Sequence, residues 1–173
     1  EDTIPYECDG LAAYRKMPLA VALPETEDQV VRILKACHAM QIPIVPRGSG
    51  TGLSGGAMPI EQGLVLSLAK FKKITKIDPF TRTAVVQPGV RNLAISEAVA
   101  KHGLYYAPDP SSQIACSIGG NVNENSGGVH CLKYGLTLHN VLRVRAVLMN
   151  GDVVEFGGMA PDAPGLDLLA VLI

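Results

Sequence analysis

The residues with the most evident chemical potential lie in one glycine-rich stretch, PRGSGTGLSGGA, from Pro46 to Ala57. Five glycines fall between Gly48 and Gly56. Glycine loses more conformational freedom on folding than any other residue, so this run would weaken a helix or a strand. A folded protein keeps such a run as a linker, as a set of strained turns, or as backbone against which a ligand lies.

Known glycine motifs fit this stretch poorly. It has no lysine, which excludes the phosphate loop G-x-x-x-x-G-K-[ST]. Gly50, Gly52 and Gly55 match the dinucleotide pattern G-x-G-x-x-G, but no helix former follows. The nearest candidate for the acidic ribose ligand expected about 20 residues later, Asp78, precedes a proline. A hydrolase is not favoured, because Gly48-Ser49-Gly50 lacks the spacing of the nucleophile pattern G-x-S-x-G. A glycine-rich turn that binds nothing remains an alternative.

Three further stretches combine small residues with hydroxyl or amide side chains: PDPSS at 108–112, CSIGGN at 116–121 and NENSGG at 123–128. Backbone amides in such loops form concave nests that bind anions without help from basic side chains. This suits a chain whose formal net charge is -1. Several loops of this kind favour one long ligand with a diphosphate, such as flavin adenine dinucleotide (FAD).

Helices and strands must position these loops. The segment 24–40 is predicted to be a helix that begins at Thr26, with Gln29 completing a capping box. A second helix is predicted at 92–103, capped by Asn92 and ended by Gly103. The runs 141–149 and 152–156 flank Asn150-Gly151, which predicts a hairpin with a type I′ turn. Further predicted elements are strands at 19–22, 42–45, 64–68, 74–77 and 83–87 and a helix at 166–173.

The fold class predicted from this order is α+β, because helices and strands occur without regular alternation. We expect two lobes in one domain spanning 1–173, lobe one over about 19–77 and lobe two over about 83–156. The apolar segment at the C-terminus suggests that the chain is part of a longer protein.

Composition narrows the function classes. The near-neutral charge and the lack of a basic cluster argue against nucleic-acid binding, and no apolar run approaches the roughly 20 residues that span a bilayer. The four cysteines form no metal-binding spacing and predict reduced thiols in a cytoplasmic protein. No histidine motif for a metal is present, so we predict no metal site.

The motifs PRGSGTGLSGGA, APDPSS, SIGGNVNENSGG and HCLKYGLT, in this order, resemble the FAD-binding domain of the vanillyl-alcohol oxidase / p-cresol methylhydroxylase superfamily. YECDGLAAYR, QPGVRNLAI and GGVHCLKYGLT resemble the branch of FAD-binding subunits of bacterial glycolate oxidases, with D-lactate and D-2-hydroxyglutarate dehydrogenases as near relatives. The similarity runs from Tyr6 to Leu172. It implies the two-lobed FAD-binding fold of the p-cresol methylhydroxylase type.

The resemblance also implies a cofactor site. The residues assigned to it are Pro46, Arg47, Gly48, Ser49, Gly50, Thr51, Gly52, Leu53, Ser54, Gly55, Gly56, Pro108, Asp109, Pro110, Ser111, Ser112, Ser117, Ile118, Gly119, Gly120, Asn125, Ser126, Gly127, Gly128, Tyr134, Gly135 and Thr137. The first loop would hold the FAD diphosphate through backbone amides, and the later segments would line the flavin. Some relatives attach flavin covalently through a histidine at the position of Thr51, so noncovalent FAD is expected here.

The activity implied by the resemblance is oxidation of a small 2-hydroxy acid, glycolate or D-lactate, with hydride transfer to FAD. The catalytic base and the cationic clamp for the substrate are expected in a C-terminal substrate domain outside this chain, so the chain alone should be inactive. The implied partners are a flavin-domain-like subunit and an iron–sulfur subunit. The expected location is the cytoplasm. Attachment to the surface of the inner membrane through those partners is an alternative.

Some alternatives stay open at this stage. His130, Tyr105 and Tyr106 could contact the flavin or pack as ordinary structural residues. The run Lys70, Lys72 and Lys73 is interpreted as solvated surface. A non-catalytic binding module of the same fold and an NAD-binding domain are the competing functions.

Overall fold

A computed structural model describes residues 2–160 and 165–173. Its first layer is a parallel sheet in the order β1-β3-β2. The sheet strands are β1 (Ala20–Ala22), β2 (Ile44–Arg47) and β3 (Leu64–Ser67). Val65 of the central strand is fully buried and pairs with Val21 on one side and Val45 on the other. Parallel strands need a crossover, and helix α1 (Glu27–Ala39) supplies it between β1 and β2.

Helix α1 packs on this sheet because its apolar residues recur at helical spacing. Val30, Leu34 and Cys37 are buried, and Thr26 caps the helix by accepting a hydrogen bond from the Gln29 amide at 3.3 Å. The predicted capping box is wrong in one detail. The Gln29 side chain accepts from the amide of Glu25, at 2.7 Å, and so bonds one residue before the cap.

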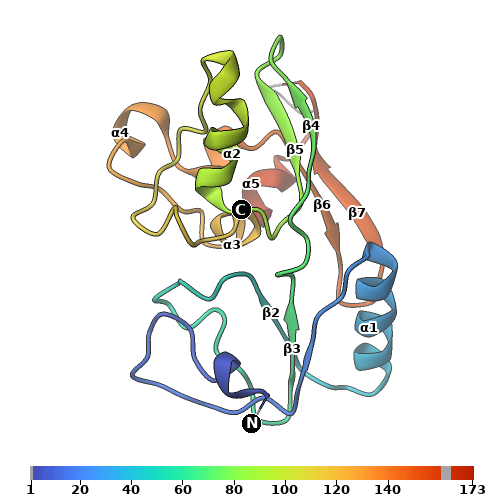
Figure 1. Cartoon of the computed structure of the whole chain (residues 1–173). Coiled ribbons are helices and arrows are strands. Elements are labelled where there is room, and N and C mark those ends of the chain that lie inside the picture. Colours follow the sequence, from blue (N-terminus) through green and yellow to red (C-terminus); the bar gives the residue numbers. More distant parts are fainter. Residues whose placement is uncertain (1, 161–164) are drawn as a thin grey trace.

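The second part of the chain holds two antiparallel hairpins and several short helices, which lie in the upper half of Figure 1. The hairpins are β4 (Ile74–Asp78) with β5 (Thr83–Val86), and β6 (Arg143–Val147) with β7 (Val153–Gly157). The helices are α2 (Asn92–Val99), α3 (Ile118–Asn123), α4 (Cys131–Tyr134) and α5 (Leu168–Leu172), with the 3-10 turns η2 (Ala100–His102) and η3 (Thr137–Asn140). One further 3-10 turn, η1 (Ile4–Tyr6), lies near the N-terminus.

Two separate apolar clusters stabilise the two halves. The first joins Val30 and Leu34 of α1 to Leu66 and Phe71, with Val147 of β6 packed against it. The second joins Val90, Ile95 and Ile118, with Ile74 of β4 among the residues packed around it. Ile74 falls in the predicted lobe one but packs on the second cluster, and Val147 falls in the predicted lobe two but packs on the first. The lobe limits themselves stay a prediction.

Three local expectations need correction. The N-cap of α2 is Arg91, because the Asn92 side chain is buried and donates to the Pro108 carbonyl at 3.0 Å. The β6–β7 hairpin exists, but its turn is not type I′. That type needs positive φ at both central residues, and of the pair only Gly151 has it, at 84°. The second strand also runs later than 42–45, from Ile44 into Arg47.

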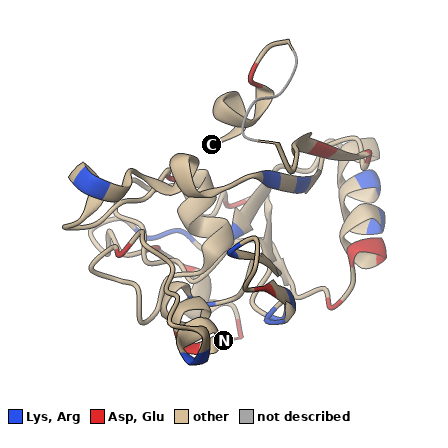
Figure 2. Cartoon of the chain, turned by 90° about the horizontal axis from the view of Figure 1, so that it is seen from above, with Lys and Arg blue, Asp and Glu red and all other residues tan. Residues whose placement is uncertain are grey.

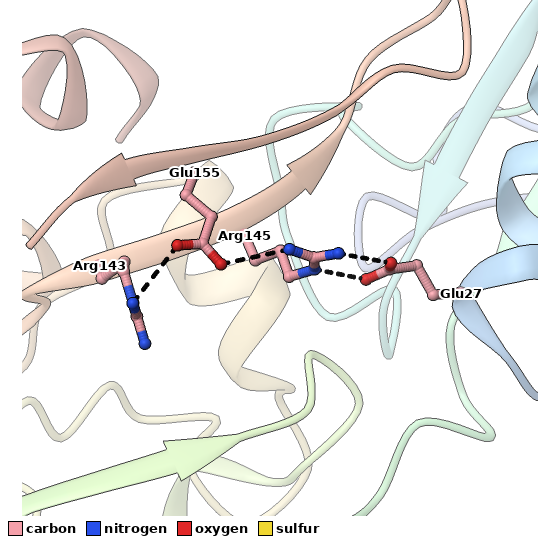
Figure 3. Close-up of polar contacts among 4 residues, drawn as sticks. All are labelled: Glu27, Arg143, Arg145 and Glu155. Atoms are coloured by element: carbon pink, nitrogen blue, oxygen red, sulfur yellow. Dashed lines mark hydrogen bonds and ion pairs between the residues drawn. The ribbon is translucent and has the colours of Figure 1, made fainter.

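The β6–β7 hairpin is fastened to α1 by an ion-pair network of four residues (Figure 3). Arg145 donates two hydrogen bonds to Glu27, at 2.8 and 2.9 Å, across 118 positions of sequence. It also pairs with Glu155 at 3.2 Å, and Glu155 pairs with Arg143 at 3.3 Å. We call these four residues the ion-pair clamp, which holds the β6–β7 hairpin against the N-terminal end of α1.

Charged residues of both signs are spread over the elements (Figure 2). The chain carries 15 Lys and Arg against 16 Asp and Glu, so the surface has no dominant sign. In the parts of the chain covered by the structure, no helix combines the length and the apolar character required to cross a bilayer.

Candidate functional site

The glycine loop, residues 48–56, follows β2 directly and is supported by contacts with the N-terminal segment. Arg47 is buried, donates to the Cys8 carbonyl at 2.7 Å, and its guanidinium lies 5.5 Å from the centre of the Tyr6 ring. Gly10 donates to the Gly52 carbonyl at 2.9 Å. Gly50 adopts a φ of 69°, and a Cβ there would overlap the Arg47 guanidinium. The arginine charge therefore supports the loop from inside and is not presented to solvent.

The loop meets helix α3 at a point where there is no room for a side chain. A Cβ on Gly48 would overlap the Ser117 hydroxyl and would lie 3.7 Å from the Gly120 amide. Ser117 is the N-cap residue of α3, and its Oγ is buried without a hydrogen-bond partner in the protein. One turn later, the buried Asn121 Nδ2 is also without a partner. Buried polar atoms are normally paired, so these two are available to hydrogen-bond a polar ligand.

A second contact joins the loop to the far end of α3. Ser54 Oγ donates to both carboxylate oxygens of Glu124, at 2.8 and 2.9 Å. Glu124 is the C-cap residue of α3, and 70 positions separate it from Ser54. The glycine loop therefore approaches one end of α3 closely and is hydrogen-bonded to the other. The sequence reasoning passed over Glu124, although an acid within the glycine-rich NENSGG motif was a visible signal.

The predicted second wall begins at Pro108, whose buried carbonyl accepts from Asn92. Asp109 accepts hydrogen bonds from the His130 ring, at 2.5 Å, and from the His130 amide, at 3.4 Å. The imidazole hydrogen bond is the main reason why the pKa of Asp109 lies below its usual value. A Cβ on Gly128 would overlap the Asp109 carbonyl, so this wall also depends on bare backbone.

The segments 125–128 and 134–137 are bound to each other. Thr137 is fully buried and donates through Oγ1 to the Ser126 carbonyl at 2.7 Å. Asn125 has a φ of 43° and accepts from the Leu138 amide at 3.0 Å. A Cβ on Gly127 would lie 2.5 Å from Leu136. These contacts give Asn125 and Thr137 a structural role in holding the wall together.

The tyrosines predicted near the wall differ in their surroundings. Tyr134 stacks edge-to-face with the exposed Tyr105, at 6.1 Å between ring centres, and Lys133 lies 5.0 Å from its ring. The hydrogen bond with Tyr105, the largest cause, lowers the pKa of Tyr134. Tyr106 instead packs on the second apolar cluster, where burial raises its pKa to about 12. Its hydroxyl is buried without a partner.

A cleft of about 440 Å³ opens beside the contact between the glycine loop and α3. Three of the predicted residues line it, namely Gly48, Ser49 and Ser117. The other residues around it are Ala69, Lys72, Ile74, Gly89, Val90, Arg91, Ala94 and Ala115. Lys72 lines the cleft and is exposed, as predicted, whereas Lys70 pairs with Glu25 at 2.5 Å. The motif QPGVR contributes Gly89 to Arg91, which the sequence reasoning had not assigned to the site.

The predicted residues thus form a connected set. The first loop contacts α3, which continues into 125–128, and that segment contacts both Asp109 and Thr137. Within residues 2–160 and 165–173, no hydrogen bond joins the glycine loop directly to 108–112 or to 134–137. The same residues contain no group of three His, Cys, Asp or Glu side chains able to hold a metal ion.

Comparison with known proteins decides the family. A family model described as "FAD binding domain" matches residues 18–157. The chain belongs to this family of FAD-binding domains. That confirms the fold class predicted from the sequence, a mixed helix-and-strand FAD-binding domain. FAD is therefore the ligand to test at the glycine loop and α3.

Among curated relatives, glycolate oxidase subunit GlcD of Escherichia coli strain K12 is 63% identical over 171 residues, which cover 99% of this chain and 34% of the relative. D-lactate dehydrogenase of Archaeoglobus fulgidus is 38% identical over 154 residues, 88% of this chain and 34% of the relative. The chain therefore spans about a third of the length of these relatives.

The fold also occurs in a solved structure of alkyldihydroxyacetonephosphate synthase. It superposes with a TM-score of 0.76 over 88% of this chain and 30% of that one, at 23% identity. At this identity the match shows the fold alone.

Proposed function

We propose that this chain binds FAD noncovalently along the contact between the glycine loop and α3, as the cofactor-binding part of a 2-hydroxy-acid dehydrogenase or oxidase. The observation that carries the proposal is the meeting of Gly48 with Ser117 and Gly120. Bare backbone and a hydroxyl without a partner face each other there, beside an open cleft. A diphosphate needs donors of this kind, and close approach to backbone needs glycine.

The donor set fits the cofactor. The Ser117 hydroxyl and the Asn121 amide group are available as hydrogen-bond donors, and Lys72 adds positive charge at the cleft. Ser49, Thr51 and Ser54 add hydroxyls to the glycine loop. The walls at 108–112 and 125–128 would hold the flavin end and exclude water from it. FAD, when bound, supplies the acceptor for the hydride that leaves the substrate α-carbon.

Noncovalent binding is the expected mode because Thr51 occupies the loop position where a histidine would attach the flavin. The glycine loop does not open a helix, since Met58 closes a turn on Gly55 with a 3.0 Å hydrogen bond. A Rossmann-type NAD site requires a helix there, so this observation favours FAD over NAD.

The proposed substrate is a small 2-hydroxy acid, glycolate or D-lactate, by analogy with the two relatives. The catalytic base and the carboxylate clamp are proposed to lie outside this chain, which then has no turnover alone. Partner subunits, one flavin-domain-like and one carrying iron–sulfur clusters, are proposed from the likeness to a glycolate oxidase subunit. The free thiols fit a cytoplasmic location, with attachment to the inner membrane only through such partners.

The test is an absorption titration of the purified chain with FAD, repeated on Ser117→Ala. We expect the wild type to bind FAD and to release it intact on acid precipitation. Ser117→Ala should weaken binding about 3-fold to 10-fold, the range of one neutral hydrogen bond. The same variant should not be less stable without FAD, because it removes a buried hydroxyl that has no partner. A wild type that binds NADH and not FAD would overturn the proposal.

A further inference from the structure

Glu124 is the one acidic side chain that the described residues bring onto the glycine loop. The Ser54 hydroxyl shares its one proton between the two oxygens of this carboxylate, at 2.8 and 2.9 Å. The carboxylate also lies over two of the glycines. A Cβ on Gly56 would be 2.9 Å from Glu124 Oε1, and a Cβ on Gly52 would be 3.7 Å away. The loop therefore already accommodates an anionic group, supplied by the protein itself.

This contact conflicts with phosphate binding in two ways. A serine hydroxyl has a single proton, so Ser54 cannot donate to a phosphate while it donates to Glu124. A carboxylate also repels a nearby diphosphate, and because Glu124 is exposed this repulsion weakens as salt is added. Glu124 and a bound diphosphate therefore oppose each other at the same loop.

We propose that Glu124 is a carboxylate gate on the glycine loop, which competes with a phosphate for the loop and lowers the affinity of the protein for dinucleotides. The proposal rests on the FAD site proposed above. The gate binds the loop to the C-terminal end of α3, and ligand binding must break the Ser54–Glu124 hydrogen bonds and move the carboxylate away. The measured affinity is then reduced by the fraction of molecules whose gate is closed.

Glu124→Gln separates charge from contact. The glutamine keeps an oxygen that accepts from Ser54, so the loop stays bound to α3, but the negative charge is gone. We expect its FAD dissociation constant to be about tenfold lower than that of the wild type at low salt. This advantage should shrink as salt is added, because screening weakens the repulsion in the wild type.

Asp28→Asn is the matched control. It also removes one exposed negative charge, but Asp28 lies on α1, where its partner is Arg32 at 3.0 Å. Its FAD affinity should equal that of the wild type. A general effect of net charge would instead change both variants alike, and that result would overturn the gate.

The titration also separates the gate from the FAD site itself. If wild type and Glu124→Gln bind FAD equally at every salt concentration, the gate is wrong and the FAD site stands. If Glu124→Gln binds more weakly, Glu124 is a ligand of the cofactor and the gate is again wrong. If neither protein binds FAD, the proposed function fails and the gate fails with it. Equal thermal stability of the two proteins would show that the affinity change does not come from loosened packing.

Discussion

Two contacts between distant parts of the chain use opposite chemistry. At the ion-pair clamp, long side chains on α1 and on the β6–β7 hairpin meet through charge, with Glu27 and Arg145 about half exposed. At the glycine loop, backbone meets α3 so closely that a single Cβ on Gly48 would overlap Ser117. The first contact tolerates movement because side chains adjust. The second fixes backbone positions, which suits a site that must match a rigid ligand.

This comparison predicts that the glycine-rich region is the more sensitive of the two. Gly128→Ala should have the largest effect, because its Cβ would overlap the Asp109 carbonyl and neither backbone segment moves freely. We expect a loss of about 3 kcal/mol in the free energy of unfolding, measured by urea denaturation. Gly158→Ala is the control, since no atom lies within 4 Å of its Cβ position. A loss as small as that of Gly158→Ala would contradict the tight packing.

Arg145→Met should have a smaller effect. The methionine keeps the apolar stem but loses the bonds to Glu27 and Glu155, whose exposed positions keep the loss in the free energy of unfolding small. Arg32→Met, which removes only the pair with Asp28, should cost about 0.3 kcal/mol. Urea denaturation at low and high salt gives the measurement. A cost for Arg145→Met that does not decrease in salt would show that the clamp works by packing.

The smallest effect is expected from pH at the Asp109–His130 pair. The pKa of Asp109 is lowered in the folded chain, mainly by the His130 hydrogen bond, so the pair stabilises the fold above the unfolded pKa. That contribution is lost as pH falls through the lowered pKa. Arg145 also lowers the pKa of Glu27. The wild type therefore loses stability at both the Asp109–His130 pair and the Glu27–Arg145 pair as pH falls.

A variant isolates the Asp109 part. In His130→Gln, the urea midpoint should fall less steeply between about pH 5 and about pH 3 than in the wild type, because the Asp109 pKa returns toward its ordinary value. Arg145→Met serves as the comparison, since it removes only the part that comes from Glu27. Identical pH profiles for His130→Gln and the wild type would refute the assignment.

Local features of the fold were predictable from the sequence, and long-range ones were not. Helix α1 and the β6–β7 hairpin follow from patterns within a few residues, such as Thr26 with Gln29. The prediction that Asn92 caps a helix is wrong because it uses only the neighbouring residues. The side chain instead binds Pro108, which lies 16 residues away. Asn150-Gly151 predicts a type I′ turn, but the same two residues also occur in longer hairpin loops. In such a loop only the glycine needs a positive φ, as Gly151 has here.

The site shows the same division. The glycine loop and the segment 117–120 were recognisable as motifs, and the structure brings Gly48 and Ser117 together. Glu124 and Lys72 were missed because nothing within their own segments reveals what they face. Arg47 was assigned to the cradle by its place in the motif, but its charge is directed to the Cys8 carbonyl below the loop. Burial of a side chain is decided by distant partners, which a motif does not contain.

The place of Val147 in the first apolar cluster has a consequence during synthesis of the chain. Most of that cluster comes from residues 22–71, yet it is completed by a strand made some 76 residues later. Until β6 leaves the ribosome, the early half exposes an apolar surface and Glu27 lacks Arg145. The nascent chain therefore cannot bury this apolar surface fully until β6 has been made, and during that delay aggregation competes with folding.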